Sequence, residues 1–170
     1  MTLRLSPTSM GVFHACHRKY QYQYVQKLRP KGENVNLIFG EAYQWGLTTL
    51  YEAKNVDTAI GAAIAKWNSY DTADEKNLRT PEKLRELITA YDKEFFGKEQ
   101  WTDNGGEILL EWPLCEGAIF TGKQDRRGWY GKERAIQENK TTTNPRWFIA
   151  EPNNQLIGYL WLESKILGEP

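Results

Sequence analysis

Two carboxylates and a lysine in the second half of the chain have the types and spacing that metal-assisted chemistry requires. Asp125 lies late in one predicted strand, residues 117–126, whereas Glu138 and Lys140 lie late in the next, residues 133–142. Side chains two positions apart project from the same face of a strand, so Glu138 and Lys140 point the same way. The three residues therefore form one candidate site if the two strands pair.

A hairpin would bring the two carboxylates together. Pairing Asp125 with Glu138 centres it between 131 and 132, inside a predicted turn at 127–132 that Gly128 and Gly131 favour. Opposite residues lie about 5 Å apart, and carboxylates that close repel each other unless a cation separates them. Such oxygens suit Mg²⁺, and a nearby lysine can position or deprotonate a metal-bound water. A solvated cross-strand salt bridge is the alternative.

A mainly helical half precedes these strands. Ser6 and Pro7 have the types of an N-cap and a first helical residue, which predicts a helix up to about Val25. The tyrosines that alternate from Tyr20 to Tyr24 fit a strand better than a helix. A loop over 28–33 is expected to follow.

The clearest predicted helix is 81–96, with Thr80 as its cap, Pro81 at its first position and Gly97 after its end. Its apolar stripe consists of Leu84, Leu87, Ile88, Tyr91 and Phe95. The other predicted elements are helices at 38–53 and 57–70, a strand at 107–115, a loop at Asn144 and Pro145, and a last helix at 153–166 opened by Pro152. Helices, three strands and a helix predict a mixed α+β (α/β) fold.

Length and composition narrow the class of protein. The 170 residues, 40% of them hydrophobic, suit one globular domain over 1–170, mainly helical over 1–100 and with the candidate strands and last helix over 106–166. No run approaches the roughly 18 apolar residues of a membrane span, and the N-terminus lacks the apolar core of a signal peptide. Cys16 and Cys115 make no disulfide framework. We expect a reduced, cytoplasmic protein without a membrane partner.

The charge is unevenly distributed. The chain has 22 Lys and Arg and 22 Asp and Glu, yet residues 1–32 hold six bases and no acid. An anionic partner on one face would account for this bias. An ordinary solvated helix face accounts for it equally well.

Several short motifs occur in a fixed order. Around the candidate site they are G-K-x-D ending at Asp125, E-x-K-T from Glu138 and Q-x-x-x-Y from Gln155 to Tyr159. Upstream, an S-x-S…C-x-x-x-Y-x-Y pattern is followed at Ser6, Thr8, Cys16, Tyr20 and Tyr22, and a G-x-A-x-H pattern at Gly40 and Ala42. Over residues 5–160 the chain thus resembles the PD-(D/E)XK nucleases of the RecB-like type, which include nuclease domains of bacterial recombination complexes, CRISPR-associated adaptation nucleases and phage exonucleases.

The resemblance implies a restriction-endonuclease-like core, with a small central sheet, an N-terminal helical layer and a flanking C-terminal helix. It implies that Asp125 and Glu138 hold Mg²⁺ or Mn²⁺ together with the backbone carbonyl of Asn139, and that Lys140 positions the attacking water. The expected function is metal-dependent hydrolysis of DNA, as an exonuclease in recombination, repair or phage DNA processing. A protein partner or a second copy of the chain stays open.

Three further residues have supporting roles in this comparison. Gln155 and Tyr159 lie four apart, hence on one helix face, which in the family looks into the site and supports the lysine or the DNA backbone. A tyrosine that only packs is the alternative. Glu111, on the preceding strand, is either a further acidic group near the metal or an exposed strand carboxylate.

The chain departs from the family pattern in three places. Gln44 replaces the histidine of G-x-A-x-H, and its amide oxygen is a weaker metal ligand than imidazole, which leaves open a catalytically degenerate DNA-binding or interaction module with the same fold. No cysteine follows Cys115, so we expect no iron–sulfur cluster within the chain and a buried, apolar Cys16. The chain also ends where relatives usually add a strand, so a minimal fold, a fragment and completion by a partner are all open.

Candidate DNA contacts follow from positive charge, because phosphate contact needs no base specificity. They are Arg18 and Lys19 in the basic segment, with His14 and Lys27 beside them, and Lys123, Arg126, Arg127 and Arg146 around the hairpin. Trp147 would stack on a base of single-stranded DNA or pack on the core.

Overall fold

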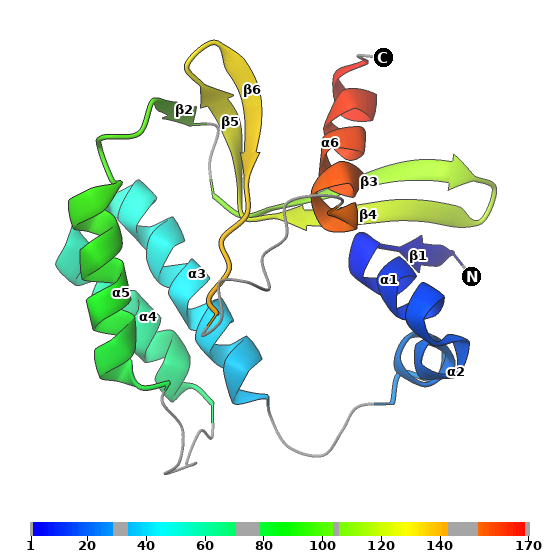
Figure 1. Ribbon diagram of the computed structural model, residues 1–170, viewed down its shortest axis with the longest axis horizontal. Coiled ribbons are helices and arrows are strands. Elements are labelled where there is room, and N and C mark those ends of the chain that lie inside the picture. The colour runs from blue at the N-terminus through cyan, green and yellow to red at the C-terminus, as the bar shows by residue number, and fades with distance from the viewer. Residues whose placement is uncertain (1, 29–33, 71–78, 104–105, 143–152, 169–170) are drawn as a thin grey trace. The chain divides into compact units, whose positions relative to one another are not determined.

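A computed structural model describes residues 2–28, 34–70, 79–103, 106–142 and 153–168 (Figure 1). The chain divides into two compact units. The terminal unit comprises Met1–Pro30, Glu107–Gln124 and Asn144–Pro170, and the central unit comprises Lys31–Gly106 and Asp125–Thr143. Each unit combines helices with a three-stranded sheet, which confirms the predicted mixed α+β class.

Three helices form most of the central unit. They are α3 (Val35–Ala53), α4 (Val56–Asn68) and α5 (Pro81–Glu94). Each begins at a polar cap, because the side chains of Asn34, Asn55 and Thr80 accept hydrogen bonds from backbone N–H groups of the first turn. The helices predicted at 38–53, 57–70 and 81–96 are confirmed apart from their end residues.

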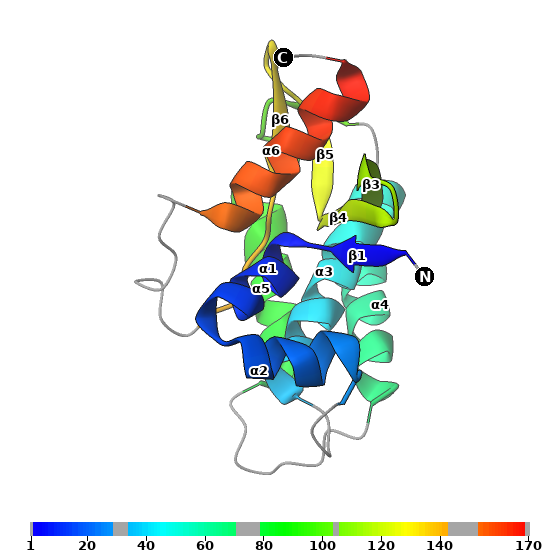
Figure 2. The same cartoon turned by 90° about the vertical axis from the view of Figure 1, so that its right-hand side faces the viewer.

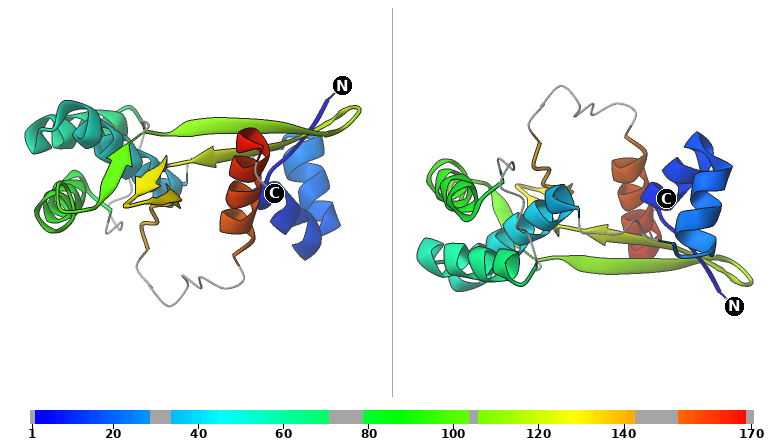
Figure 3. Two further views of the ribbon diagram at one scale, coloured as in Figure 1. Left: turned by 90° about the horizontal axis from the view of Figure 1, so that it is seen from above. Right: turned by 90° about the horizontal axis from the view of Figure 1, so that it is seen from below.

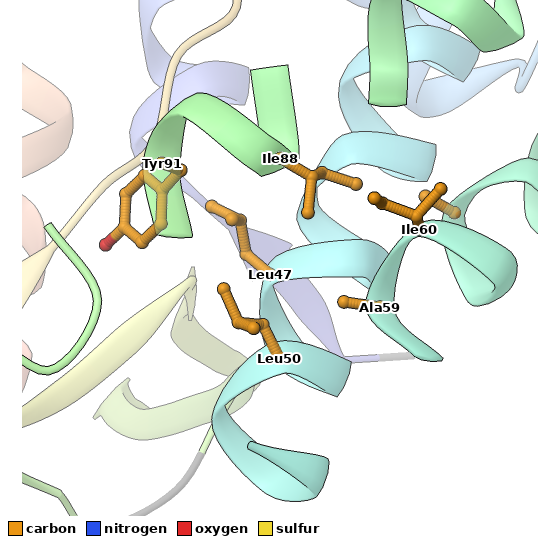
Figure 4. Packing of buried hydrophobic residues seen from close by; sticks show 7 residues of the cluster. Leu47, Leu50, Ala59, Ile60, Ile88 and Tyr91 are labelled. Atoms are coloured by element: carbon orange, nitrogen blue, oxygen red, sulfur yellow. The ribbon is translucent and has the colours of Figure 1, made fainter. Parts of the chain in front are cut away.

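The core of the central unit lies between these helices. Figure 4 shows side chains of α3, α4 and α5 meeting in one cluster. Its buried members are Leu47, Leu50, Ala59, Ile60, Ala63, Ile88 and Tyr91. On α5 the predicted stripe is buried at Leu84, Ile88 and Tyr91, but Phe95 is 51% exposed. The prediction for Phe95 is wrong because α5 already ends at Glu94.

The sheet of the central unit has the order β2-β5-β6 and is antiparallel. Its strands are β2 (Trp101–Asp103), β5 (Arg126–Tyr130) and β6 (Glu133–Gln137). Gly131 closes the β5–β6 turn with a φ of +62°, a conformation that favours glycine. The turn predicted at 127–132 is therefore too long, since most of it is strand β5.

The terminal unit contains a second sheet, of order β1-β4-β3, with β1 parallel and β3 antiparallel to β4. Its strands are β1 (Leu3–Leu5), β3 (Ile108–Cys115) and β4 (Ala118–Gln124). Its helical segments are α1 (Pro7–Ala15), α2 (His17–Tyr20), a π-helix (Gln21–Val25) and α6 (Asn154–Leu167). Figure 3 shows α1 and α6 on the same face of the sheet. The apolar core there is Leu110, Phe120 and Leu162.

The predicted first strand of the hairpin is wrong in one respect. Residues 117–126 do not form one strand, because β4 ends at Gln124 in one sheet and β5 begins at Arg126 in the other. The second strand is also shorter than predicted, since β6 ends at Gln137. The strands β1 and β2 were not predicted.

The N-terminal segment differs from its prediction in two details. Ser6 caps α1 as expected, but the helix is interrupted at Cys16, which is exposed and whose Sγ accepts a hydrogen bond from the Lys19 N–H at 3.5 Å. The prediction of a buried Cys16 is wrong, because the residue caps α2. The alternating tyrosines are helical, and the rings of Tyr20 and Tyr24 stack at i and i+4 with centroids 5.2 Å apart.

No helix in the part of the chain that the structure describes is long and apolar enough to cross a membrane. Most of the predicted loop at 28–33, the loop at Asn144 and Pro145, and Pro152 lie outside the described residues.

Candidate active site

Asp125 and Glu138 flank the same end of the β5–β6 hairpin. The last paired residues of these strands are Arg126 and Gln137. Asp125 and Glu138 are the next residues outward, Asp125 just before β5 and Glu138 just after β6. The strands pair from Arg126 with Gln137 to Tyr130 with Glu133. This is the register that the sequence predicts.

A backbone hydrogen bond ties the segment after β6 to the first carboxylate. The N–H of Asn139 donates to Oδ2 of Asp125 across 2.7 Å. A hydrogen bond from a neutral donor to a carboxylate is short and strong because the acceptor is charged. The contact holds Asn139, and with it the neighbouring Glu138, beside Asp125.

Glu138 and Lys140 form an ion pair. The Glu138 side chain is only 7% exposed, whereas that of Lys140 is 46% exposed. A nearly buried carboxylate is costly unless a positive charge compensates it. Lys140, the more exposed partner, supplies that charge.

Gln44 of α3 connects both strand ends. Its Nε2 donates to the backbone carbonyl of Asp125 across 3.3 Å, and its Oε1 accepts from Nδ2 of Asn139 at 3.0 Å. Both polar ends of the amide are therefore used in contacts within the protein. The motif comparison placed Gln44 at a metal-ligand position, whereas the structure shows it as a clamp between the start of β5 and the end of β6.

The hydrogen-bond network continues beneath the sheet through residues that sequence reasoning missed. Nε2 of Gln137 donates to Oδ1 of Asn139 at 3.1 Å and to the Tyr91 hydroxyl at 3.0 Å. Nη1 of Arg126 donates to Oε1 of Gln137 at 3.3 Å and to Oε2 of Glu99 at 3.2 Å. The strand period offered one signal, since Gln137 must face away from Glu138 and hence toward the helices.

Arg126 is the centre of this network and is 5% exposed. Its guanidinium carbon lies 3.8 Å from the ring centroid of Tyr51 and 4.7 Å from that of Trp101. A cation between two aromatic faces is stabilised by both rings. The expectation that Arg126 contacts DNA is therefore corrected, because a phosphate cannot reach a side chain that is buried and ion-paired.

Tyrosine hydroxyls complete the network without adding charge. The hydroxyls of Tyr51 and Tyr91 share a hydrogen bond. Burial raises the pKa of Tyr51 above its ordinary value, and the hydrogen bond to Tyr91 raises it further; burial also raises the pKa of Tyr91. Burial raises the pKa of Tyr43, on the same helix as Tyr51, to about 12. All three hydroxyls therefore stay neutral near neutral pH.

Gln155 and Tyr159 share one face of α6, as predicted. Nε2 of Gln155 donates to the Tyr159 hydroxyl at 2.8 Å. Tyr159 is 6% exposed, and a Cβ added to Gly122 of β4 would lie only 2.9 Å from its ring. The glycine of the G-K-x-D motif thus lets α6 pack closely on β4. Both residues belong to the terminal unit, and their catalytic support stays a prediction.

Two predicted site residues form surface ion pairs within the terminal unit. Glu111 of β3 pairs with Arg4 of β1. Lys123 of β4 pairs with Glu107 across 2.7 Å. Exposed pairs of this kind contribute little stability, so the pair with Glu107 does not prevent Lys123 from binding an anion. Glu111 is an exposed strand carboxylate, one of the two alternatives that the sequence left open.

Of the remaining candidate DNA contacts, Arg127 is half-buried on β5, and the others lie in the N-terminal segment or beyond the described residues. Arg18 and Lys19 are exposed on α2. Arg146 and Trp147 lie outside the part of the chain that the structure describes.

The donor set for a metal consists of oxygen atoms. Within the described ranges, no group of three or more His, Cys, Asp or Glu side chains is placed to hold a metal ion. Two carboxylates with a backbone carbonyl are instead the kind of sparse oxygen set that suits Mg²⁺, which keeps several of its waters. Asp125, Glu138 and the carbonyl of Asn139 fit that description.

Comparison with known proteins gives one match. The family model of the PD-(D/E)XK nuclease superfamily matches residues 4–168. The match therefore includes both units and all three residues of the candidate site. No curated protein and no solved structure matches the chain.

Proposed function

Because the chain belongs to the PD-(D/E)XK nuclease superfamily, we propose that it is a metal-dependent deoxyribonuclease acting through Asp125, Glu138 and Lys140. Membership supports a nuclease-type hydrolase. The observation that supports the finer proposal is the hairpin register, whose outermost pair, Arg126 with Gln137, leaves Asp125 and Glu138 as the next residues on either side, and Lys140 forms an ion pair with Glu138. The reaction adds water across a phosphodiester P–O bond and yields a phosphate monoester and a hydroxyl end.

In this proposal Asp125, Glu138 and the carbonyl of Asn139 hold Mg²⁺ or Mn²⁺. The bound ion supplies charge neutralisation at the phosphate and lowers the pKa of a coordinated water. The remaining requirements fall on the protein, which must keep two like charges close together and fix their orientation. The N–H of Asn139 orients the Asp125 carboxylate, and Gln44 holds both strand ends.

Lys140 has two tasks. Its ammonium group compensates the nearly buried Glu138 in the free protein. When DNA is bound, the same group donates to the attacking water or to a phosphate oxygen, where negative charge grows in the transition state. Its 46% exposure is consistent with a group that reaches toward a ligand from the rim of the site.

An exonuclease is the finer form of this proposal, supported by the resemblance to RecB-like nucleases. The test is incubation of labelled linear and covalently closed circular DNA, single- and double-stranded, with Mg²⁺ or Mn²⁺. Degradation of linear DNA alone supports an end-dependent nuclease. Cleavage of closed circles would overturn the exonuclease assignment while keeping the nuclease.

A catalytically degenerate DNA-binding module is the second candidate. Gln44 favours it, because both ends of its amide are engaged within the protein and neither is offered to a metal. The module predicts DNA binding that is indifferent to Mg²⁺ and to Glu138→Ala. A nuclease predicts that DNA binding changes when Mg²⁺ is added and when Glu138 is replaced by alanine.

A further inference from the structure

The segment formed by α1, α2 and the π-helix of the terminal unit is drawn in blue in Figure 2. It carries several exposed aromatic rings. The aromatic strip consists of Phe13, His17, Tyr20 and Tyr24, and Tyr22, two residues from both Tyr20 and Tyr24, projects from another face of the same segment. Phe13 is 43% exposed, and Tyr22 and Tyr24 are each 38% exposed. Neither α2 nor the π-helix buries any residue. The strip thus lies at the surface rather than against a core.

Most of these rings contact one another. Phe13 stacks on His17 with centroids 4.2 Å apart and planes inclined by 24°. Phe13 also meets Tyr20 edge to face at 5.3 Å, and Tyr20 stacks on Tyr24 at 5.2 Å. Mutual contacts restrict the rotamers of the rings, so a ligand that binds them loses less conformational entropy on ordering the site.

Basic residues occur in the same segment as the strip. Residues 2–28 contain four Lys and Arg, two His and no Asp or Glu. The guanidinium of Arg18 lies 5.6 Å from the centre of the Tyr22 ring, and its Nε donates to the Tyr22 hydroxyl at 2.9 Å. Lys19 is exposed on the same helix. The partner of this surface must therefore be anionic as well as able to lie against aromatic rings.

We propose that the aromatic strip binds single-stranded DNA, with bases stacked on its tyrosines and phosphates held by Arg18 and Lys19. Single strands combine exposed base faces with backbone charge, and stacking platforms in cationic grooves bind them without sequence preference. A duplex hides its base faces inside the helix and offers the rings nothing to stack on. The inference rests on the proposed function, since it gives the nuclease a surface for single-stranded substrate.

The test measures DNA binding apart from cleavage. Full-length Lys140→Ala protein in metal-free buffer is titrated into a labelled oligonucleotide, single-stranded or annealed as a duplex, and followed by fluorescence anisotropy. Changing both Tyr20 and Tyr24 to Leu, which keeps apolar side chains but removes the rings, is expected to weaken binding by about 5-fold or more, the effect of losing one base–aromatic stack. Changing both to Phe keeps the rings and is expected to preserve affinity. Phe95→Leu, an exposed aromatic of the central unit, is the matched control.

A second measurement does not depend on the tyrosines. Lys19→Gln is expected to flatten the dependence of log affinity on log salt by about 0.7, the value for one lost phosphate contact on a single strand. Arg85→Gln, on exposed positions of α5, is expected to leave that slope unchanged. Thermal unfolding of every variant is followed by circular dichroism, and Lys19→Gln decides the matter if a tyrosine variant fails to fold.

The outcomes separate this inference from the nuclease itself. Loss of single-strand affinity in the Leu variant, with the Phe variant unchanged, supports the strip whether or not the wild type cleaves DNA. Equal affinity in all variants overturns it, as does an equal loss for duplex and single strand. Equal losses in the Leu and Phe variants also overturn stacking. Cleavage by the wild type with an indifferent strip would leave the nuclease standing and refute only the strip.

Discussion

Gln44 and Asn139 are joined side chain to side chain, Nδ2 of Asn139 donating to Oε1 of Gln44 at 3.0 Å. Because Gln44 lies on α3 and Asn139 follows Glu138, this bond fixes the end of β6 against a helix of the core. The backbone bond from Asn139 to Asp125 extends the same restraint to the other carboxylate. Gln44 thus ties Asn139 and the backbone of Asp125 to α3.

Gln44→Ala should destabilise the central unit. The substitution removes one donor and one acceptor that both contact the ends of the hairpin, and we expect a loss of about 1–2 kcal/mol in the free energy of unfolding. Urea unfolding measures it, with the exposed Gln26→Ala as control. A midpoint equal to that of the wild type would show that the clamp does not stabilise the fold.

Arg126→Met should destabilise the protein more strongly. It leaves Glu99, whose side chain is 19% exposed, without the cation beside it, and removal of one partner of a buried pair costs about 3–5 kcal/mol. The double variant Arg126→Met, Glu99→Gln should recover part of that loss. Arg85→Met, on the surface, should change little. If Arg126→Met lowered DNA affinity and left the unfolding free energy unchanged, Arg126 would be a phosphate contact after all.

Stability should fall at alkaline pH through the buried tyrosines. Burial raises the pKa of Tyr43 from 10.0 to about 12 in the folded protein. Below pH 10 the Tyr43 hydroxyl is protonated in both the folded and the unfolded state, so the contribution of Tyr43 to stability is fully present. As the pH rises from about 10 to about 12, the hydroxyl ionises first in the unfolded state, and the free energy of unfolding falls. Tyr43→Phe should reduce this loss, measured as unfolding free energy against pH. The prediction would be contradicted if Tyr43→Phe left the alkaline loss of unfolding free energy unchanged, or if the exposed Tyr130→Phe reduced that loss equally.

Metal binding should depend on Glu138 and Asp125 but not on every acidic residue nearby in the sequence. Calorimetric titration with Mn²⁺ is expected to give a heat of binding in the wild type that Glu138→Gln and Asp125→Asn abolish. Glu111→Gln is the matched control, because Glu111 pairs with Arg4 in the terminal unit. If Glu138→Gln still bound Mn²⁺, or if Glu111→Gln did not, the metal site would not be the one formed by Asp125 and Glu138.

The helices and the hairpin register could be predicted because their signals are local. Thr80 and Pro81 mark a helix start by their own chemistry, and a residue pair symmetric about a glycine turn defines a register. The change of sheet at Asp125 could not be predicted, since residues 117–126 read as one continuous strand and no local signal marks a break between Gln124 and Arg126. The three-residue strands β1 and β2 exist only through pairing with β4 and β5.

The chemistry of single side chains was harder to predict than the elements. The charge of Arg126 and its place beside the hairpin are typical of a phosphate contact. Only the tertiary structure reveals that Tyr51 and Trp101 enclose it. The sequence matched Gln44 to a position of the family motif, but it did not reveal the partner, Asn139, that determines the role of Gln44. Asp125, Glu138 and Lys140 were accessible to sequence reasoning because the hairpin register and the order of the motifs around it both single them out, although β6 already ends at Gln137.

The most direct test of the central claim compares wild type with Lys140→Ala on labelled linear DNA in the presence of Mg²⁺ or Mn²⁺, with Lys132→Ala as the matched control. We expect metal-dependent degradation by wild type and Lys132→Ala, and none by Lys140→Ala, which is less stable than the wild type but stays folded at the assay temperature and keeps a DNA affinity close to that of the wild type. Equal degradation by Lys140→Ala, or no degradation by the wild type with either metal, would contradict it.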